Sequence, residues 1–149
     1  MAAVRSATVT WQGDLVSGRG SVSAATSELF LDLPVSWASR TEDPDGRTSP
    51  EELLAAAHAS CFAMAFSGEL GRAGFTPEHL HVSADVTFDK LEDGWTVVSS
   101  TLTVLGRVPG CTDVRFDELA AAAKDGCPIS RALAGNVALS VEATLEHDA

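Results

Sequence analysis

The sequence predicts an α+β protein whose sheets are mostly antiparallel. Segments in which apolar and polar residues alternate, the pattern of half-buried strands, occur near both ends and in the centre of the chain. A long Ala-rich helical segment over residues 53–70 and two shorter ones after residue 112 interrupt them. The order β-β-β-α-β-β-α-α-β is typical of an α+β fold. The length of 149 residues corresponds to one ordinary domain, which we expect to span residues 1–149.

Three strands and a long loop are expected before the central helix. Residues 4–12 predict the first strand, because small and apolar side chains alternate with polar ones there. Turn-forming residues follow, and further strands are expected over residues 20–25 and 28–33. Residues 34–48 contain two prolines, an Asp-Gly pair and several polar residues, so they predict a loop. Loops of this length in a compact domain are usually functional or mobile.

The central helix has a clear start signal. Ser49 suits the N-cap, Pro50 suits the first helical position, and Glu52 stands three residues after the cap, as in a capping box. The nearly uncharged run that follows reaches Gly68 before any helix breaker. A helix that is apolar on all sides is usually buried, so this segment predicts a central core helix.

The second half of the chain predicts a hairpin, two helices and a last strand. Residues 80–89 alternate cleanly, and Asp93-Gly94 is a hairpin turn leading into a strand over residues 95–108. Turn and helix-start signals divide the remaining chain. The elements expected there are two helices and one strand, over residues 113–124, 128–135 and 136–146.

Composition excludes several classes of protein. Hydrophobic residues make up 45% and charged residues 21%, as in globular domains. The net charge of −11 repels phosphate backbones, so no nucleic-acid partner is expected. We find no signal-peptide pattern and no unbroken apolar run of about 20 residues, so a cytoplasmic protein without membrane contact is expected. Three cysteines are too few for a disulfide scaffold.

The cysteines differ in their local settings. Cys61 lies mid-helix, beyond the reach of the helix dipole, and its setting alone also suits an inert core thiol. Lowering its pKa from about 8.5 to about 5.5 needs roughly 4 kcal/mol, which a nearby cation would have to supply. Cys127 precedes Pro128 at a helix start, where it is either a reactive thiol or a simple N-cap residue. No role is expected for Cys111 in its turn.

Other polar residues remain open from spacing alone. His58, three residues before Cys61, could be a base, a metal ligand or a core histidine. The loop offers Arg40 and Arg47 as cations. Glu51 either complements the helix N-terminus or holds a loop arginine. Zinc-ligand spacing and nucleotide-binding motifs do not occur, so neither a metal nor a cofactor is expected.

Two long motifs resemble those of the OsmC/Ohr family, the osmotically inducible and organic hydroperoxide resistance proteins. Residues 48–65 (TSPEELLAAAHASCFAMA) resemble the first family motif, and residues 126–133 (GCPISRAL) resemble the second. Residues 11–14, 74–77 and 108–110 also fit, particularly the OsmC branch. The likeness covers almost the whole chain.

The resemblance implies a fold and a set of site residues. Antiparallel sheets would wrap around long central helices in an intertwined homodimer, with active sites built from both subunits. Cys61 matches the peroxidatic cysteine, Cys127 the resolving cysteine, and Glu51 the acid that orients an arginine. That arginine is Arg40 by similarity to the OsmC branch or Arg19 by similarity to the Ohr branch, and we favour Arg40.

The activity implied is that of a thiol peroxidase. Organic hydroperoxides would be reduced to alcohols through a Cys61 sulfenate and a Cys61–Cys127 disulfide. An external dithiol would then reduce the disulfide; in Ohr relatives this dithiol is a lipoylated protein. Side chains flanking Cys61 would form apolar walls that favour alkyl hydroperoxides: Phe62, Met64 and Phe66.

Two alternatives remain at this stage. One is a non-enzymatic stress or small-molecule-binding protein on the same fold, with inert buried thiols. The other is a hydrolase-like cysteine enzyme that would pair Cys61 with His58.

Overall fold

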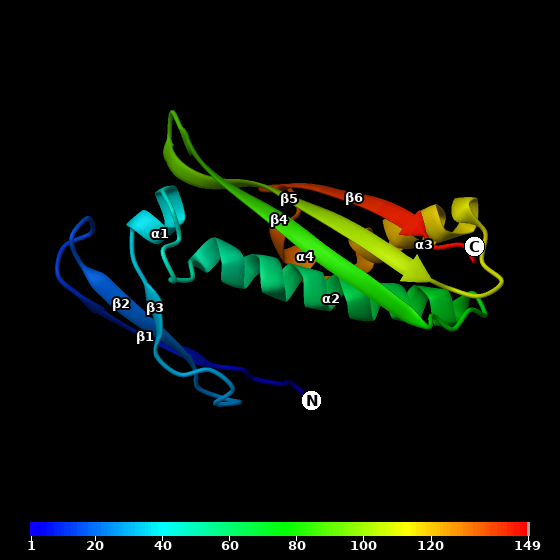
Figure 1. Cartoon of the computed structure of the whole chain (residues 1–149), viewed down its shortest axis with the longest axis horizontal. Helices are drawn as coiled ribbons and strands as arrows, with labels where there is room; N and C mark the ends of the chain where they lie inside the picture. The colour runs from blue at the N-terminus through cyan, green and yellow to red at the C-terminus, as the bar shows by residue number, and fades with distance from the viewer. Residues whose placement is uncertain (149) are drawn as a thin grey trace. The chain divides into compact units, whose positions relative to one another are not determined.

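The computed structural model describes residues 1–148. It divides the chain into two compact units, Met1–Leu53 and Leu54–Ala149. The predicted order of elements is confirmed, with one short helix added before the central one (Figure 1). The elements are β1 (Ala7–Gln12), β2 (Arg19–Ala24), β3 (Leu33–Val35), α1 (Ala38–Thr41), α2 (Pro50–Arg72), β4 (His79–Leu91), β5 (Gly94–Arg107), α3 (Asp113–Gly126), α4 (Pro128–Leu133) and β6 (Ala138–Leu145).

The N-terminal unit contains a three-stranded antiparallel sheet in the order β1-β2-β3. The prediction of a strand over residues 28–33 is wrong, because the chain turns there and β3 begins only at Leu33. Glu28 and Asp32 have φ angles of 57° and 54°, in the left-handed region that a strand cannot contain. The Asp32 N–H donates to the Ser23 hydroxyl at 2.9 Å, which anchors the turn to β2.

The C-terminal unit is built on the sheet β4-β5-β6. β4 and β5 form the predicted antiparallel hairpin, whereas β6 lies parallel to β5. A parallel pair needs a crossover connection, and α3 and α4 supply it. The rings of Phe66 on α2 and Phe116 on α3 lie 4.9 Å apart in the shared core. Gly106 of β5 makes room for this packing, since a Cβ there would lie 2.8 Å from the Phe116 ring.

The start of α2 follows its sequence signal closely. The Glu52 N–H donates to the Ser49 hydroxyl at 3.1 Å, which satisfies one of the free donors of the first turn. The Glu52 carboxylate accepts a hydrogen bond from the Thr48 hydroxyl at 2.7 Å instead of returning to the cap residue. Ser49 therefore caps the helix, and Glu52 ties it to the preceding strand-like segment.

Burial along α2 is one-sided in the single chain. His58, Phe62, Phe66 and Leu70 recur every four residues and are fully buried. Met64 lies on another face and is 72% exposed. The expectation of a helix buried on all sides therefore holds for one face only.

Length and a mean hydropathy of 1.3 would let α2 cross a membrane, but the core helix of a globular protein meets the same criterion.

Candidate functional site

The structure brings Cys61 and Cys127 together in the C-terminal unit. Cys61 lies beside the buried stripe of α2, and Cys127 lies at the junction of α3 and α4. The two thiols are near enough for each to shift the pKa of the other. Both are reduced, with Cys127 fully buried and Cys61 partly accessible. The fold therefore brings together two cysteines that lie far apart in the sequence.

The two thiols differ in acidity. Burial and the hydrogen bond to Cys127 raise the pKa of Cys61, and the Ile129 backbone N–H only partly opposes them. The pKa of Cys127 is lowered. Burial alone would raise it, but polar groups nearby outweigh this effect: the backbone and hydroxyl of Ser130, the Cys61 thiol and the Ile129 backbone. Within this unit the surroundings of Cys61 therefore do not favour its thiolate, so lowering its pKa needs a further cation.

His58 is fully buried and is held by two serines. Its Nδ1 lies 2.7 Å from the Ser100 Oγ and its Nε2 lies 2.8 Å from the Ser130 Oγ. Burial lowers the pKa of His58, which keeps the ring neutral at physiological pH. Both ring nitrogens are engaged by serines, which argues against a His58–Cys61 nucleophile pair. Sequence reasoning missed Ser100 and Ser130, because their contacts with His58 are formed only in the folded chain.

The N-terminal unit pairs Arg40 with Glu51. The Arg40 Nη2 lies 2.6 Å from Glu51 Oε1, and its Nε lies 3.1 Å from Oε2. This two-point contact fixes the plane of the guanidinium, and the Arg40 Cζ also lies 5.4 Å from the centre of the Trp37 ring. The short helix α1, which the sequence did not predict, carries Arg40. Glu51 lies in the first turn of α2, the helix that also carries Cys61.

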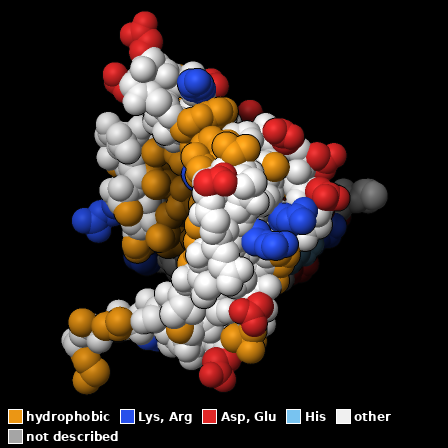
Figure 2. Space-filling view, turned by 90° about the vertical axis from the view of Figure 1, so that its left-hand side faces the viewer, with side chains coloured by type: hydrophobic (Ala, Val, Ile, Leu, Met, Phe, Trp, Pro, Cys, Tyr) orange, Lys and Arg blue, Asp and Glu red, His pale blue; other side chains and the backbone are white. Residues whose placement is uncertain are grey.

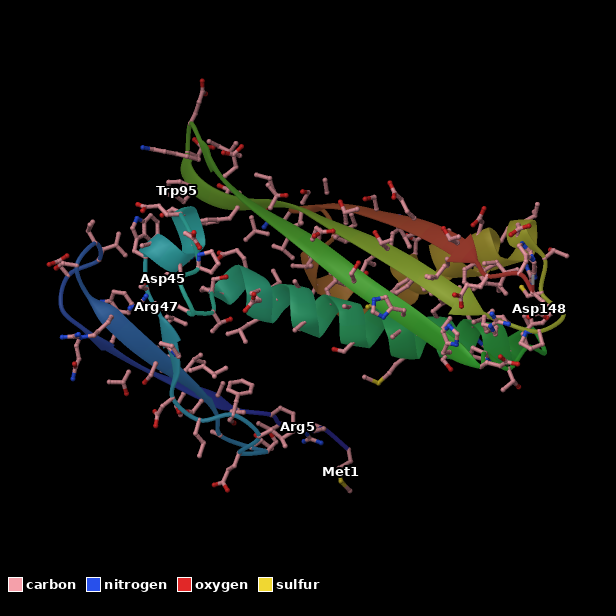
Figure 3. All side chains as sticks on the ribbon, viewed as in Figure 1. Met1, Arg5, Asp45, Arg47, Trp95 and Asp148 are labelled. Atoms are coloured by element: carbon pink, nitrogen blue, oxygen red, sulfur yellow. The ribbon has the colours of Figure 1, made fainter. Side chains whose placement is uncertain are left out.

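The other candidate arginines have different settings. Arg19 is exposed at the first position of β2. Arg47 forms an ion pair with Asp45 at 3.2 Å in the segment before α2 (Figure 3). Of the arginines considered from the sequence, Arg40 is the one that contacts Glu51.

An apolar groove of about 520 Å³ lies beside Arg40 in the N-terminal unit. Figure 2, which faces the side of the β1–β3 sheet, shows hydrophobic side chains exposed to solvent. The lining includes Val9, Trp11, Val35, Trp37 and Leu53, together with Arg40. Sequence reasoning missed this groove, because its walls come from several short elements.

The expectation that Phe62 and Phe66 form apolar walls beside Cys61 is wrong, whereas Met64 stays a prediction. Phe62 and Phe66 are fully buried in the core, so they offer no surface to a ligand. Met64 points away from that core and is exposed. Cys111 lies in its predicted turn, where burial raises the pKa of its thiol. Across residues 1–148, no group of three or more His, Cys, Asp or Glu side chains is placed to hold a metal ion.

Fold and site together define an α+β protein with a neighbouring pair of reduced cysteines. The family model for OsmC-like proteins matches residues 43–142, and the chain belongs to this family. It is 40% identical to peroxiredoxin OsmC of Escherichia coli over 89% of this chain and 91% of the relative. It is 30% identical to the organic hydroperoxide resistance protein OhrA of Bacillus subtilis, over 85% and 89%.

Solved structures show the same fold. An organic hydroperoxide resistance protein OsmC from Legionella pneumophila superimposes with a TM-score of 0.70 at 23% identity, covering 96% of this chain and 99% of that one. OhrB of Bacillus subtilis superimposes with a TM-score of 0.67 at 24% identity, covering 93% and 98%. The family model and the two relatives confirm the family resemblance of the two sequence motifs, and the solved structures confirm the fold.

Proposed function

We propose that the protein is a thiol peroxidase that reduces organic hydroperoxides to alcohols. The observation that carries this proposal is that the thiols of Cys61 and Cys127, which come from distant parts of the sequence, lie near enough to shift each other's pKa. The names of the relatives, a peroxiredoxin and an organic hydroperoxide resistance protein, support a peroxide-related redox role.

The proposed reaction has two steps on the protein. The Cys61 thiolate attacks the distal oxygen of the hydroperoxide, the O–O bond breaks, and the proton released by Cys61 returns to the alkoxide to give the alcohol. Cys61 is left as a sulfenic acid. Cys127 then loses its proton and attacks the Cys61 sulfur; the S–O bond breaks, and the hydroxide takes up that proton to leave as water.

Arg40 is the proposed cation for Cys61. Its guanidinium would hold the peroxide oxygens and stabilise the Cys61 thiolate, which the surroundings of Cys61 in its own unit do not favour. Glu51 would keep the guanidinium plane fixed through their two-point contact. Since Arg40 also lines the apolar groove, an alkyl group in that groove would bring its peroxide end to the guanidinium.

We propose that the active protein is an intertwined homodimer whose sites use both subunits. Met64 supports this, because it is a large apolar side chain on α2 and is 72% exposed in the single chain. An external dithiol, such as a lipoylated protein, would reduce the disulfide. A cytoplasmic location is proposed, because its reducing environment regenerates thiols.

Peroxide consumption tests the proposal. The native protein should consume cumene hydroperoxide in the presence of a dithiol, and Cys61→Ser should abolish turnover. Cys111→Ser is the matched control, since it removes a partly buried thiol that lies in a separate turn. Undiminished consumption by Cys61→Ser, or none by the native protein, would contradict the proposal.

A further inference from the structure

The buried ring of His58 joins three elements of the C-terminal unit. His58 lies on α2, and its Nδ1 and Nε2 hydrogen-bond to Ser100 on β5 and Ser130 on α4, at 2.7 and 2.8 Å. The three side chains are at most 1% exposed. A neutral imidazole has one donor and one acceptor nitrogen, and a hydroxyl serves as either, so both contacts are satisfied in either tautomer. The peroxide reaction written above uses none of these side chains.

Ser130 attaches α4 to the core. This helix has six residues, Pro128–Leu133, of which Ser130 is the buried one, while Ile129 packs at the edge of the core. A helix this short is not stable by itself, so its position depends on contacts with the rest of the unit. A buried hydrogen bond is costly to lose, because the groups left behind have no water to bind. The Ser130–His58 hydrogen bond therefore ties α4 to α2.

This tie lies one helical turn from each cysteine. Cys61 follows His58 by three residues on α2, so the two stand on adjacent turns. Cys127 likewise precedes Ser130 by three residues, and its carbonyl accepts a hydrogen bond from the Arg131 N–H at 2.9 Å. Cys127 therefore moves with the first turn of α4. Cys127 belongs to the buried core, and Cys61 packs against that core.

We propose, resting on the peroxidase function above, that His58 and Ser130 are positioning residues for the resolving step: their hydrogen bond holds the start of α4, and with it Cys127, against the helix that carries the other cysteine. Two thiols held side by side have a high effective concentration, which favours a disulfide in rate and at equilibrium. Neither positioning residue exchanges a proton with the peroxide or the sulfurs, so the balance of the two steps is unchanged.

The reduction potential of the cysteine pair tests this role without peroxide. In a Cys111→Ser protein, Cys61 and Cys127 are the remaining thiols, and their disulfide is equilibrated with glutathione buffers and mapped by mass. Adding Ser130→Ala should make the disulfide about tenfold less favourable, which raises the potential by about 30 mV. An unchanged or more negative potential would overturn the inference.

Ser100→Ala is the matched control, because it leaves the other nitrogen of the same ring without its buried partner. Each serine variant loses one buried hydrogen bond to His58, so urea unfolding of the reduced proteins should show similar losses of stability. Ser100 belongs to β5 and not to α4, so its variant should shift the disulfide equilibrium by less than threefold. Equal shifts in the two variants would overturn the inference, because the histidine would then act on the fold as a whole.

A double-variant cycle tests whether the two residues act together. His58→Leu should raise the potential about as much as Ser130→Ala does. The protein with both changes should shift little further, since the hydrogen bond is already broken in each single variant. Additive shifts in the potential would contradict the proposal.

Kinetics connect this tie with the proposed reaction. After one equivalent of cumene hydroperoxide, disulfide formation in Ser130→Ala should slow by about tenfold relative to sulfenate formation. Equal slowing of the two steps would contradict the positioning role. A native protein that consumes no peroxide would instead contradict the proposed function, while the potentials above, measured without peroxide, would still decide whether the tie positions the cysteines.

The native protein provides a test that needs no variant. The N–H groups of Arg131 and Ala134 donate to backbone carbonyls of α4 and its cap, at 2.9 and 2.8 Å. If α4 is tied to the core, these amides should exchange with solvent at least about a hundredfold more slowly than in an unfolded chain. NMR of the reduced protein follows their exchange. Exchange at the unprotected rate would overturn the inference.

Discussion

The Arg40 guanidinium is clamped on the Glu51 carboxylate, with 2.6 Å between Nη2 and Oε1 and 3.1 Å between Nε and Oε2. The Glu51 side chain is only 9% exposed, against 27% for Arg40. A carboxylate held in this way fixes both the position and the plane of its arginine. Glu51 therefore fixes the position of the positive charge of Arg40.

Glu51→Gln should lower kcat/KM for cumene hydroperoxide by about tenfold or more, because the amide keeps the size but loses the charge that holds the guanidinium. Steady-state assays of peroxide loss measure this. Glu52→Gln is the matched control, since Glu52 is the exposed neighbour in the same helical turn. If the two variants lose activity equally, Glu51 has no special role in orienting Arg40.

Trp11→Ala should weaken the binding of alkyl groups in the apolar groove. Removing the indole should weaken the binding free energy of an alkyl group in the groove by about 1–2 kcal/mol, because less apolar surface is buried. KM for cumene hydroperoxide should therefore rise by about tenfold, while the rate with hydrogen peroxide should stay unchanged. Leu29→Ala serves as control, because Leu29 is 87% exposed and lies outside the groove lining. A parallel loss with both peroxides would show that the groove does not select for the alkyl group.

Stability should depend on pH through His58. Its folded-state pKa lies below the ordinary value of 6.5, so below that pH the unfolded chain binds a proton that the folded chain does not. The stabilisation is complete above 6.5 and is lost as the pH falls, by up to about 1.4 kcal/mol per pH unit. Urea unfolding should show a steeper acid loss in the native protein than in His58→Gln. Parallel curves would contradict this.

Met64→Arg should prevent dimer formation if the exposed face of α2 packs against a second subunit. Burying an unpaired charge at the centre of such an interface costs more free energy than the surrounding contacts contribute. Sedimentation should then report a monomer. Val114→Arg is the control, since Val114 is a similarly exposed residue, 69% against 72%, on α3. A Met64→Arg protein that sediments like the native one would place the subunit contact elsewhere.

Local signals in the sequence predicted most elements of the fold. Ser49 and Pro50 marked the start of α2, and the alternating residues of β4 and β5 marked the hairpin. The error over residues 28–33 arose where backbone conformation overrides composition: the segment is rich in apolar residues, but the positive φ angles of Glu28 and Asp32 turn the chain.

The site was only partly predictable. The setting of Cys127 at a helix start suggested a reactive thiol, whereas its contact with Cys61 joins segments far apart in sequence and was implied only by the family resemblance. The Arg40–Glu51 contact was likewise implied by resemblance. The partners of His58 depend on how β5 and α4 pack against α2, which spacing along the chain cannot show.

The most direct test of the account is a single turnover followed by mass spectrometry. One equivalent of tert-butyl hydroperoxide is added to the fully reduced protein, and the peptides are mapped without reductant. The account predicts that the chain loses two hydrogen atoms and that the Cys61 and Cys127 peptides are joined by a disulfide. Cys61 found as a sulfinic acid, with a free Cys127 thiol and no such joined peptide, would contradict it.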